Sequence, residues 1–344
     1  MQGLVTVFGG SGFVGKYVVR ALAREGWRIR VASRRPDRRP ELKVMGEVGQ
    51  IEFARTDLKN AASVELALHG AEAVVNLVAV LFESGGQTFE ALQAKGAATI
   101  AQAAAARGIT RFIQVSAIGA DARGASDYAR AKAQGEAAVR AAIPTATVLR
   151  PSIVFGPEDR FFNRFAAMAA VSPVLPLIGA DTRFQPVYAG DVGQAVAEAM
   201  KPGREAAGRT YELGGPGVYS FRELMRIMLH DIQRRRALLP IPFGVAGLMG
   251  RAGDLQAQVL PLAPPVTSDQ VRLLRSDNVA DPAFPGLANL GVEATALDAV
   301  LPTYLWRFRS GGQFAQVAGH DANDPPGGQA DPGPGRGYKP QVTG

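Results

Sequence analysis

The sequence predicts an α/β fold in which a doubly wound parallel sheet is followed by a smaller C-terminal lobe. From residue 3 to about 150, short runs rich in β-branched residues alternate with Ala-rich helical stretches. A glycine-rich turn directly follows the first of these runs. After residue 151 the alternation fades. We therefore expect one domain over 1–150, a smaller lobe over 151–309 that partly returns to the sheet, and a tail.

Each element of the expected sheet has its own local pattern. The expected strands are 4–8, 29–33, 51–54, 73–77, 112–116 and 146–149. The expected helices between them are 14–24, 61–68, 89–106 and 126–142, each with apolar residues at helical spacing. Right-handed crossovers bring the carboxyl ends of parallel strands to one edge of the sheet. That edge is where we expect a ligand.

The smaller lobe is less regular. Helices are predicted near 161–170, 191–200 and 221–231, and single strands such as 210–213 lie between them. The run 161–165 fits an amphipathic helix with Phe161 and Phe165 inward. A further helix begins at Thr267, where Thr267 and Gln270 have the spacing of a capping box.

The predicted helix 243–260 is unusual because it combines an apolar face with repeated glycines. The apolar face consists of Val245, Leu248, Met249, Ala252 and Val259, and glycine recurs at 244, 247, 250 and 253. Each glycine inside a helix costs roughly 1 kcal/mol relative to alanine. Such a helix needs a further surface to stabilise it: a partner, a membrane surface, the wall of a substrate pocket or the protein's own core.

The last 35 residues, 310–344, have a low-complexity composition. Glycine and proline account for 14 of them, and large apolar residues are almost absent. A segment of this kind cannot bury enough apolar surface to offset its conformational entropy. We expect the tail to be disordered in isolation or ordered by a partner.

Composition excludes several classes of protein. The chain has no cysteine, and its three histidines, His69, His230 and His320, are scattered, so we expect no metal and a reducing compartment. No apolar stretch reaches about 18 residues, so no transmembrane span is expected. The net charge of +7 suits an anionic membrane surface, an acidic partner or a phosphate-bearing ligand. Nucleic-acid binding is not expected, because no recognition motif accompanies the charge.

The glycine-rich turn is the most specific signal. It reads Gly9, Gly10, Ser11, Gly12, Phe13, Val14 and Gly15, between the first strand and the first helix. Gly9 permits a tight turn, Gly12 lets backbone amides approach a pyrophosphate, and Gly15 lets the helix pack closely on the sheet. The N-terminus of that helix attracts phosphate. The turn therefore predicts a dinucleotide-binding Rossmann domain.

Residues at the ends of the next strands indicate which dinucleotide binds. The second strand ends in Ser33, Arg34 and Arg35, where an NAD-binding protein usually has an acidic residue. Guanidinium groups suit a 2′-phosphate, so NADPH is favoured over NAD(H). The alternative is that these arginines belong to an ordinary solvated loop. Further contacts to the adenosine are expected from Asp57, Leu58, Asn76, Val78 and Ala79, although each also suits a turn.

Tyr128 and Lys132 are candidate catalytic residues. They lie four residues apart on a predicted helix and so share one face. A lysine ammonium beside a tyrosine hydroxyl favours the phenolate, and the lysine also suits the nicotinamide ribose. The alternative is a chance pair on an Ala-rich helix.

Together these residues resemble the short-chain dehydrogenase/reductase superfamily in its extended and atypical branches, which include the nucleotide-sugar epimerases. The resemblance covers residues 3 to about 230 and includes the glycine turn, Asp57, Ser116, Tyr128 and the run 150–151 (RP). It implies that Ser116 and Pro151, as well as Tyr128 and Lys132, contact the cofactor.

A closer resemblance is to the dehydrogenase-like accessory subunits of respiratory complex I, the NADH:ubiquinone oxidoreductase, in their bacterial form. It rests on the runs 155–163 (FGPEDRFFN), 185–188 (QPVY), 190–192 (GDV) and 269–271 (DQV). It implies a structural NADPH and partners among the other complex I subunits of the quinone-reducing arm. It also implies a peripheral position on the cytoplasmic face of the bacterial inner membrane, with contact to the membrane surface.

The sequence departs from a working extended enzyme in one respect. Ser116 is followed by Ala117, Ile118 and Gly119, and Tyr128 comes only 12 positions later, so Ser116 is a doubtful catalytic serine. Loss of one oxyanion-stabilising donor commonly lowers the rate about 100-fold or more. We therefore expect Tyr128 and Lys132 to be cofactor contacts first. The alternatives are an active NADP-dependent reductase or nucleotide-sugar epimerase/dehydratase, and an NADP(H)-sensing regulator.

Overall fold

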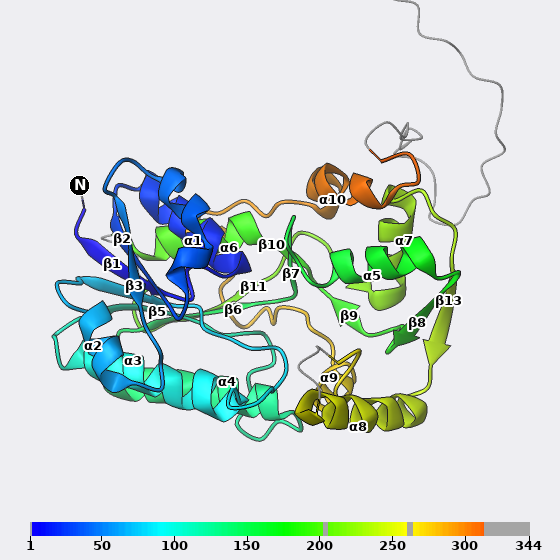
Figure 1. The fold of residues 1–344 in the computed structure, drawn as a ribbon, viewed down its shortest axis with the longest axis horizontal. Coiled ribbons are helices and arrows are strands. Elements are labelled where there is room, and N and C mark those ends of the chain that lie inside the picture. Colours follow the sequence, from blue (N-terminus) through cyan, green and yellow to red (C-terminus); the bar gives the residue numbers. More distant parts are fainter. Residues whose placement is uncertain (1, 202–205, 260–263, 313–344) are drawn as a thin grey trace, which may run out of the picture.

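A seven-stranded parallel sheet forms the centre of the molecule (Figure 1). The computed structural model describes residues 2–201, 206–259 and 264–312. The strand order is β3-β2-β1-β4-β5-β6-β11, and every neighbouring pair is parallel. The strands are β1 (Leu4–Phe8), β2 (Arg28–Ser33), β3 (Ile51–Arg55), β4 (Ala73–Asn76), β5 (Arg111–Val115), β6 (Thr147–Pro151) and β11 (Thr210–Leu213). The predicted doubly wound α/β fold is confirmed, with strand ends within two residues of expectation.

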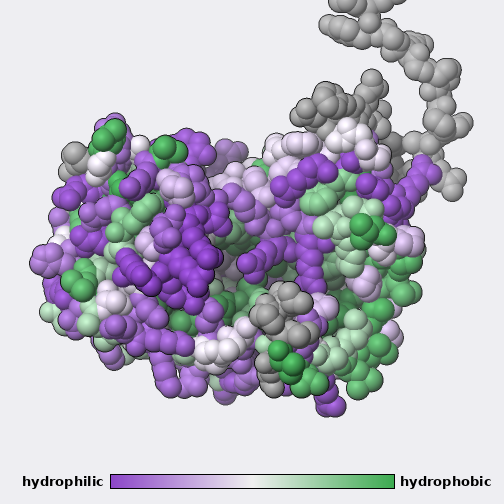
Figure 2. Space-filling model, in the orientation of Figure 1, coloured by the Kyte–Doolittle hydropathy of each residue, from purple (hydrophilic) through white to green (hydrophobic). Residues whose placement is uncertain are grey.

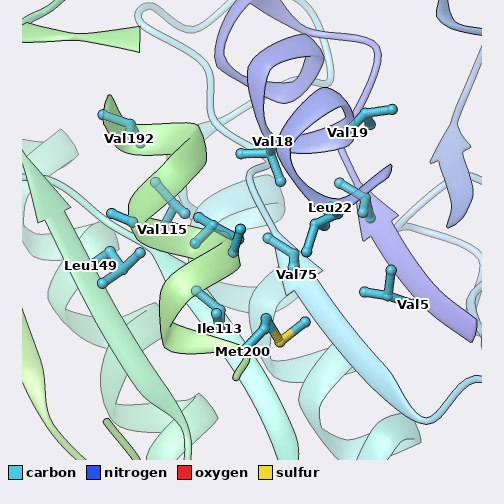
Figure 3. Packing of buried hydrophobic residues seen from close by; sticks show 14 of the residues in the cluster. Val5, Val18, Val19, Leu22, Val75, Ile113, Val115, Leu149, Val192 and Met200 are labelled. Carbon is cyan, nitrogen blue, oxygen red and sulfur yellow. The ribbon is translucent and has the colours of Figure 1, made fainter. Parts of the chain in front are cut away.

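Helices cover both faces of the sheet (Figure 1). On one face lie α1 (Phe13–Arg24) and α6 (Ala189–Ala199), and on the other lie α2 (Ala61–Ala67), α3 (Gly96–Ala105) and α4 (Asp127–Ala142). Alternate residues of each strand point to opposite faces, so Val5 and Val7 pack under α1 while Phe8 packs under α3. In Figure 3, Val18 and Leu22 of α1 meet Val192 and Met200 of the α6 segment over the sheet. A late segment of the chain therefore completes the core of the first domain.

The predicted single helix 89–106 is wrong at its start. Residues Glu90–Lys95 form a π-helix, which we label η3, and regular α-helix begins only at Gly96. A Cβ on Gly135 of α4 would lie 2.3 Å from the Gln93 carbonyl oxygen, so the wide turn packs tightly against α4. Apolar periodicity does not encode such a local change of hydrogen-bond register.

Residues after 151 also build a second core. It lies between α5 (Phe162–Val171), α7 (Phe221–Asp231), α10 (Leu297–Leu305) and the parallel pair β8 (Val174–Ile178) and β13 (Ala237–Ile241). Phe161 and Phe165 face inward as predicted, 5.5 and 5.3 Å from the Phe221 ring centroid. Short pairs join β7 (Val154–Phe155) to β10 (Val187–Tyr188) and β9 (Arg183–Phe184) to β12 (Tyr219–Ser220). The short 3-10 helices are η1 (Pro36–Arg38), η2 (Pro40–Met45), η4 (Ala288–Leu290) and η5 (Trp306–Phe308).

The glycine-containing helix forms as α8 (Phe243–Val259) and packs against α9 (Ser268–Leu273). Thr267 caps α9 in the predicted capping box with Gln270. Gly250 and Gly253 lie against this segment, where a Cβ would come within 2.8 Å of Ser268 and 1.9 Å of the Val266 oxygen. Apart from Phe243 at the start of the helix, small residues therefore make the contact between α8 and the rest of the chain.

The large apolar residues of α8 lie on its outer side. Leu248 is 66% exposed, Leu255 63% and Val259 71%, and Figure 2 shows hydrophobic residues gathered over this helix at the lower right. The alternative that this face belongs to the protein's own core is wrong. None of the described helices is both long enough and apolar enough to span a bilayer. The predicted tail lies, from residue 313 on, outside the described residues.

Candidate dinucleotide-binding site

The glycine turn joins β1 to α1 in the conformation that its sequence predicts. Gly9 has φ +80°, its N–H donates to the Ala32 carbonyl oxygen over 3.1 Å, and the Gly12 N–H donates to the Gly9 oxygen over 2.9 Å. A Cβ on Gly15 would lie 2.4 Å from the Gly9 oxygen. Only glycine therefore lets α1 start this close to the turn.

The first turn of α1 is available to an anion. Gly12 is the N-cap and provides no side-chain acceptor, and the first turn has no acidic residue. The N–H groups at the start of a helix lack intrahelical partners and lie at the positive end of its dipole. Ser11, Phe13 and Val14 surround this point. The arrangement suits a pyrophosphate.

The end of β2 presents two guanidinium groups beside a buried hydroxyl. Arg34 and Arg35 follow β2 with exposed side chains, and within the described chain neither guanidinium has a hydrogen-bond or ion-pair partner. Ser33 Oγ is buried with no hydrogen-bond partner among the described residues. A buried hydroxyl without a partner costs about 1–3 kcal/mol, which indicates that a ligand or water completes it. These groups fit the ribose end of a dinucleotide with a 2′-phosphate.

Of the residues expected to contact the adenosine after β3 and β4, some have side chains that are engaged within the protein and others have side chains that solvent can reach. The Asp57 carboxylate accepts from the Lys59 N–H over 3.0 Å, and Leu58 is buried beneath α3. The Asn76 amide donates to Gln114 over 2.9 Å and accepts from the Val78 N–H over 3.1 Å. Val78 is half-buried and Ala79 is exposed. The side chains of Asp57, Leu58 and Asn76 thus shape the loops, and the open surface after β4 is that of Val78 and Ala79.

Ser116 and Pro151 lie at the carboxyl ends of β5 and β6, on the same edge of the sheet. The Ser116 N–H donates to the Leu149 oxygen over 2.7 Å, and the Ile118 N–H donates to the Pro151 oxygen over 3.1 Å. Ser116 Oγ is buried and has no hydrogen-bond partner within the described residues. It is the second unpaired hydroxyl on this edge, after Ser33. Both fit a site that a polar ligand completes.

Tyr128 and Lys132 lie on α4 and share one face, as predicted. The Lys132 ammonium lies 5.8 Å from the centroid of the Tyr128 ring and donates a hydrogen bond to the Val115 carbonyl oxygen over 3.4 Å. The Tyr128 ring packs edge-on against Phe89 with centroids 5.6 Å apart. The two side chains are therefore held between β5 and the π-helix.

Burial changes the ionisation of both side chains. Burial, with the Asp269 carboxylate as a smaller cause, raises the pKa of Tyr128 to about 12. Burial lowers the pKa of Lys132 to about 8, against a smaller opposing effect of Glu136. At neutral pH the tyrosine is a neutral phenol and the lysine an ammonium. In these states both side chains can donate hydrogen bonds, for example to a ribose.

Asp269 is a residue at this site that the sequence analysis missed as a contact. Its carboxylate accepts from Ser126 Oγ over 2.7 Å, from the Asp127 N–H over 2.6 Å and from the Tyr128 N–H over 3.2 Å. It therefore caps α4 from a position more than 140 residues later in the chain. The run 269–271 stands out in the sequence, but nothing in the sequence indicates that Asp269 contacts the start of α4.

Comparison with known proteins identifies the family. Residues 5–214 match the model of the NAD dependent epimerase/dehydratase family. An Arabidopsis thaliana relative, NADH dehydrogenase [ubiquinone] 1 alpha subcomplex subunit 9, is 34% identical over 91% of this chain and 80% of its own length. The Neurospora crassa NADH-ubiquinone oxidoreductase 40 kDa subunit is 32% identical over 90% and 80%. A ceramide reductase of Caulobacter vibrioides is 31% identical over 70% and 74%.

Solved structures share the fold at lower sequence identity. The Escherichia coli NADPH-dependent quinone oxidoreductase QOR2, complexed with NADPH, matches with a TM-score of 0.66 and 18% identity over 88% of this chain and 98% of its own. The Thermus thermophilus UDP-glucose 4-epimerase, in complex with NAD, matches with a TM-score of 0.63 and 18% identity over 89% and 99%. The chain belongs to the NAD-dependent epimerase/dehydratase family, and its homologues there include the accessory subunits of NADH:ubiquinone oxidoreductase.

Proposed function

We propose that this protein is an accessory subunit of the bacterial form of complex I, the NADH:ubiquinone oxidoreductase, and that it holds NADPH as a structural cofactor. The observation that carries the proposal is the 34% identity to a mitochondrial NADH dehydrogenase subunit of Arabidopsis thaliana over 91% of the chain. The match extends beyond the family's nucleotide-binding part, residues 5–214. It therefore includes α8, α9 and α10 as well as the nucleotide-binding part.

The proposed NADPH site uses the residues at the carboxyl edge of the sheet. The glycine turn and the start of α1 bind the pyrophosphate, and Arg34 and Arg35 bind the 2′-phosphate. The buried Ser33 hydroxyl, which has no partner among the described residues, donates a hydrogen bond to the same phosphate. Val78 and Ala79 line the adenosine side. Ser116, Tyr128, Lys132 and Pro151 hold the nicotinamide side. Bound NADPH would supply a hydride, but the residues around it are arranged to hold the nucleotide.

The proposed lack of turnover depends on Ser116. Ser116 lies at the end of β5, with its N–H bound to Leu149 of β6. No second hydroxyl follows it in the run 117–119. The protein therefore stabilises the region near the quinone-reducing arm by binding, with NADPH stabilising its own fold.

The proposed partners are the other complex I subunits of the quinone-reducing arm, reached through α8. Its outer face exposes Val245, Leu248, Met249, Leu255 and Val259. A contiguous apolar face of this kind marks an interaction site. The proposed position is peripheral, on the cytoplasmic face of the bacterial inner membrane, with α8 turned to the partner and the adjoining membrane surface. In this proposal, residues 1–150 are the nucleotide domain and 151–309 the docking lobe.

The first test is isolation of the untagged chain from native membranes in mild detergent. We expect it to comigrate with quinone-reductase subunits on native gels, and alkaline extraction of the band, which preserves the reduced nucleotide, to release NADPH. Recovery of the chain as a free soluble protein, with no complex I subunit beside it, would contradict the proposal.

The second test separates the 2′-phosphate from the rest of the nucleotide. Replacing Arg34 and Arg35 together with alanine should weaken NADPH binding by about tenfold or more, since each charge-assisted hydrogen bond contributes roughly 1.5–3 kcal/mol. NADH affinity should stay unchanged. The matched control is the pair Arg38→Ala and Arg39→Ala in the same loop, measured by nucleotide fluorescence. Equal losses for both nucleotides would assign the 2′-phosphate to other residues.

The second candidate function is an active NADP-dependent reductase or epimerase/dehydratase. The observation in its favour is that Tyr128 and Lys132 lie on one face of α4, with the unpaired Ser116 hydroxyl on the same sheet edge. Its test is hydride transfer by the isolated chain to a panel of sugar nucleotides and carbonyl compounds. Turnover that Tyr128→Phe abolishes would establish it. Under the leading proposal, Tyr128→Phe leaves complex I activity largely intact.

A further inference from the structure

A cavity of about 430 Å³ opens between α7 and the start of β13, far along the chain from the nucleotide site. Five arginines line it: Arg222, Arg226, Arg234, Arg235 and Arg236. No Asp or Glu is among the described residues that line it. A concave surface with charge of one sign concentrates its field on an ion of the opposite sign.

Two of these arginines are fixed in place by backbone carbonyls. Arg234 Nε donates to the Phe308 oxygen over 2.9 Å, and Arg236 Nε donates to the Ala169 oxygen over 2.7 Å. Ala169 lies in the last turn of α5, whose carbonyls attract cations. These bonds orient the guanidinium groups without neutralising their charge. The charge at the cavity is therefore preorganised.

The other three arginines carry little compensation. Arg222 lies 3.6 Å from Asp181, whose own side chain is 91% exposed. Within the described chain, the guanidinium groups of Arg226 and Arg235 have no hydrogen-bond partner and no carboxylate at ion-pair distance. Among the described residues, the Asp181 carboxylate is therefore the only one within 4 Å of these five guanidinium groups, and the Glu223 carboxylate interacts with Arg226 from further away.

We propose that this cavity binds the phosphate group of an organic phosphate ester. Guanidinium groups match the geometry of phosphate oxygens and bind them through paired hydrogen bonds. Leu229 and Leu238 complete the lining, so one wall suits an apolar organic part. The cavity shares no element with the nucleotide site at β1, α1 and β2, so it is a second anion site.

Two sources supply this chemistry: a soluble phosphate ester and the headgroup of an anionic phospholipid. The second source has support from the fold, because β13 leads from the cavity to exposed Leu239 and then into α8 (Figure 1). The arginine cavity and the outer face of α8 thus lie at the two ends of one strand. The experiment distinguishes the sources.

The test compares two double variants of the full chain with equal loss of charge. Arg226→Gln with Arg235→Gln removes the two guanidinium groups that have no partner in the described chain, so the fold is retained. Arg28→Gln with Arg123→Gln is the control, because both arginines are exposed elsewhere. Inorganic pyrophosphate is titrated by calorimetry in the presence of saturating NADPH. Cosedimentation is measured with vesicles of phosphatidylcholine, with and without one-fifth phosphatidylglycerol.

We expect the cavity variant to bind pyrophosphate about tenfold or more weakly than the control, as loss of charge-assisted hydrogen bonds requires. Vesicle binding that falls in parallel identifies the phospholipid headgroup as a source, and vesicle binding that is equal in both variants identifies a soluble ester. Pyrophosphate binding that is equal in both variants, or absent from the wild-type chain outside the nucleotide site, overturns the proposal. The result does not depend on assembly into complex I.

Discussion

Tyr128 and Lys132 are neighbours on one helix face, yet burial moves their pKa values in opposite directions. A phenol is neutral when protonated, so burial raises its pKa, whereas an ammonium is charged when protonated, so burial lowers its pKa. In both cases the neutral form is favoured. Because the pKa of Lys132 remains about 8, its ammonium persists at neutral pH and can still donate to a ribose. The pair is thus suited to holding a nucleotide.

This ionisation predicts a pH dependence of nucleotide binding. Above about pH 8 Lys132 loses its proton, so NADPH affinity should decline as the pH rises from 7 to 9.5. The measurement is a series of NADPH titrations by fluorescence. Lys132→Arg, whose guanidinium stays charged, should flatten the profile. A flat wild-type profile would show that the Lys132 ammonium does not contact the nucleotide.

The lowered pKa of Lys132 also makes the free energy of unfolding depend on pH. The pKa of Lys132 is about 8 in the folded chain and 10.5 for an ordinary lysine, so the unfolded chain binds more protons between these values. The contribution of Lys132 to the free energy of unfolding therefore rises with pH from about 8 to 10.5. Below pH 8 the residue is charged in both states and its burial destabilises the fold by a constant amount.

At the scale of an element, α8 divides its residues by size. The side that contacts the chain has Ala246, Gly250, Gly253 and Ala257, and the outer side has the large apolar residues. Gly250 and Gly253 are required by the close approach of the 266–268 backbone, whereas Gly244 and Gly247 have nothing within 4 Å of an added Cβ. The regular glycine spacing therefore has two different meanings along one helix.

This difference gives opposite signs for two identical substitutions. Gly247→Ala should raise the free energy of unfolding by up to about 1 kcal/mol, since alanine is the better helix former and meets no neighbour. Gly253→Ala should lower it, because the new Cβ would lie 1.9 Å from the Val266 oxygen. Urea unfolding of each variant measures both. The same sign for both would show that the contact of α8 with Val266 is not formed in solution.

Introducing charged residues on the outer face of α8 tests whether that face binds complex I. Replacing Leu248 and Leu255 together with arginine should leave the isolated fold stable, since both are more than 60% exposed, but should release the chain from complex I. The matched control is Leu66→Arg with Val171→Arg, at residues 75% and 87% exposed on α2 and α5. The measurement is the fraction that comigrates with complex I on native gels. Equal retention of both variants would assign the contact to another surface.

At the scale of the whole molecule, three aspartates join early and late segments of the chain. Asp159 accepts from Tyr304 Oη over 2.5 Å, Asp191 accepts from Thr295 Oγ1 over 2.8 Å, and Asp269 accepts from Ser126 Oγ over 2.7 Å. All three belong to the short runs that resemble the complex I subunits. Asp269 thus fixes the start of α9 against the nucleotide domain, while Asp159 and Asp191 join parts of the chain that both follow residue 150.

Asp269 allows the strongest test of this linkage. Asp269→Asn keeps the shape but provides one acceptor oxygen where two are used, so at least one donor at the start of α4 loses its partner, at a cost of about 1–3 kcal/mol. We expect a lower Tm and weaker NADPH binding, because α4 carries Tyr128 and Lys132. Asp37→Asn, at an exposed position, is the control. An unchanged Tm would show that the cap contributes nothing.

The sequence by itself determined the strands of the central sheet and the helices between them, the glycine turn, the cap at Thr267 and the positions of Arg34, Arg35, Tyr128 and Lys132. These features depend on local periodicity and backbone conformation, which neighbouring residues encode. Tertiary structure alone decided the π-helix at Glu90–Lys95, the outward direction of the large side chains of α8 and the cap that Asp269 places on α4. It also brought together the five arginines of the cavity. Each depends on contacts between residues distant in sequence or on which side of a helix meets the core, and periodicity within one segment does not contain that information.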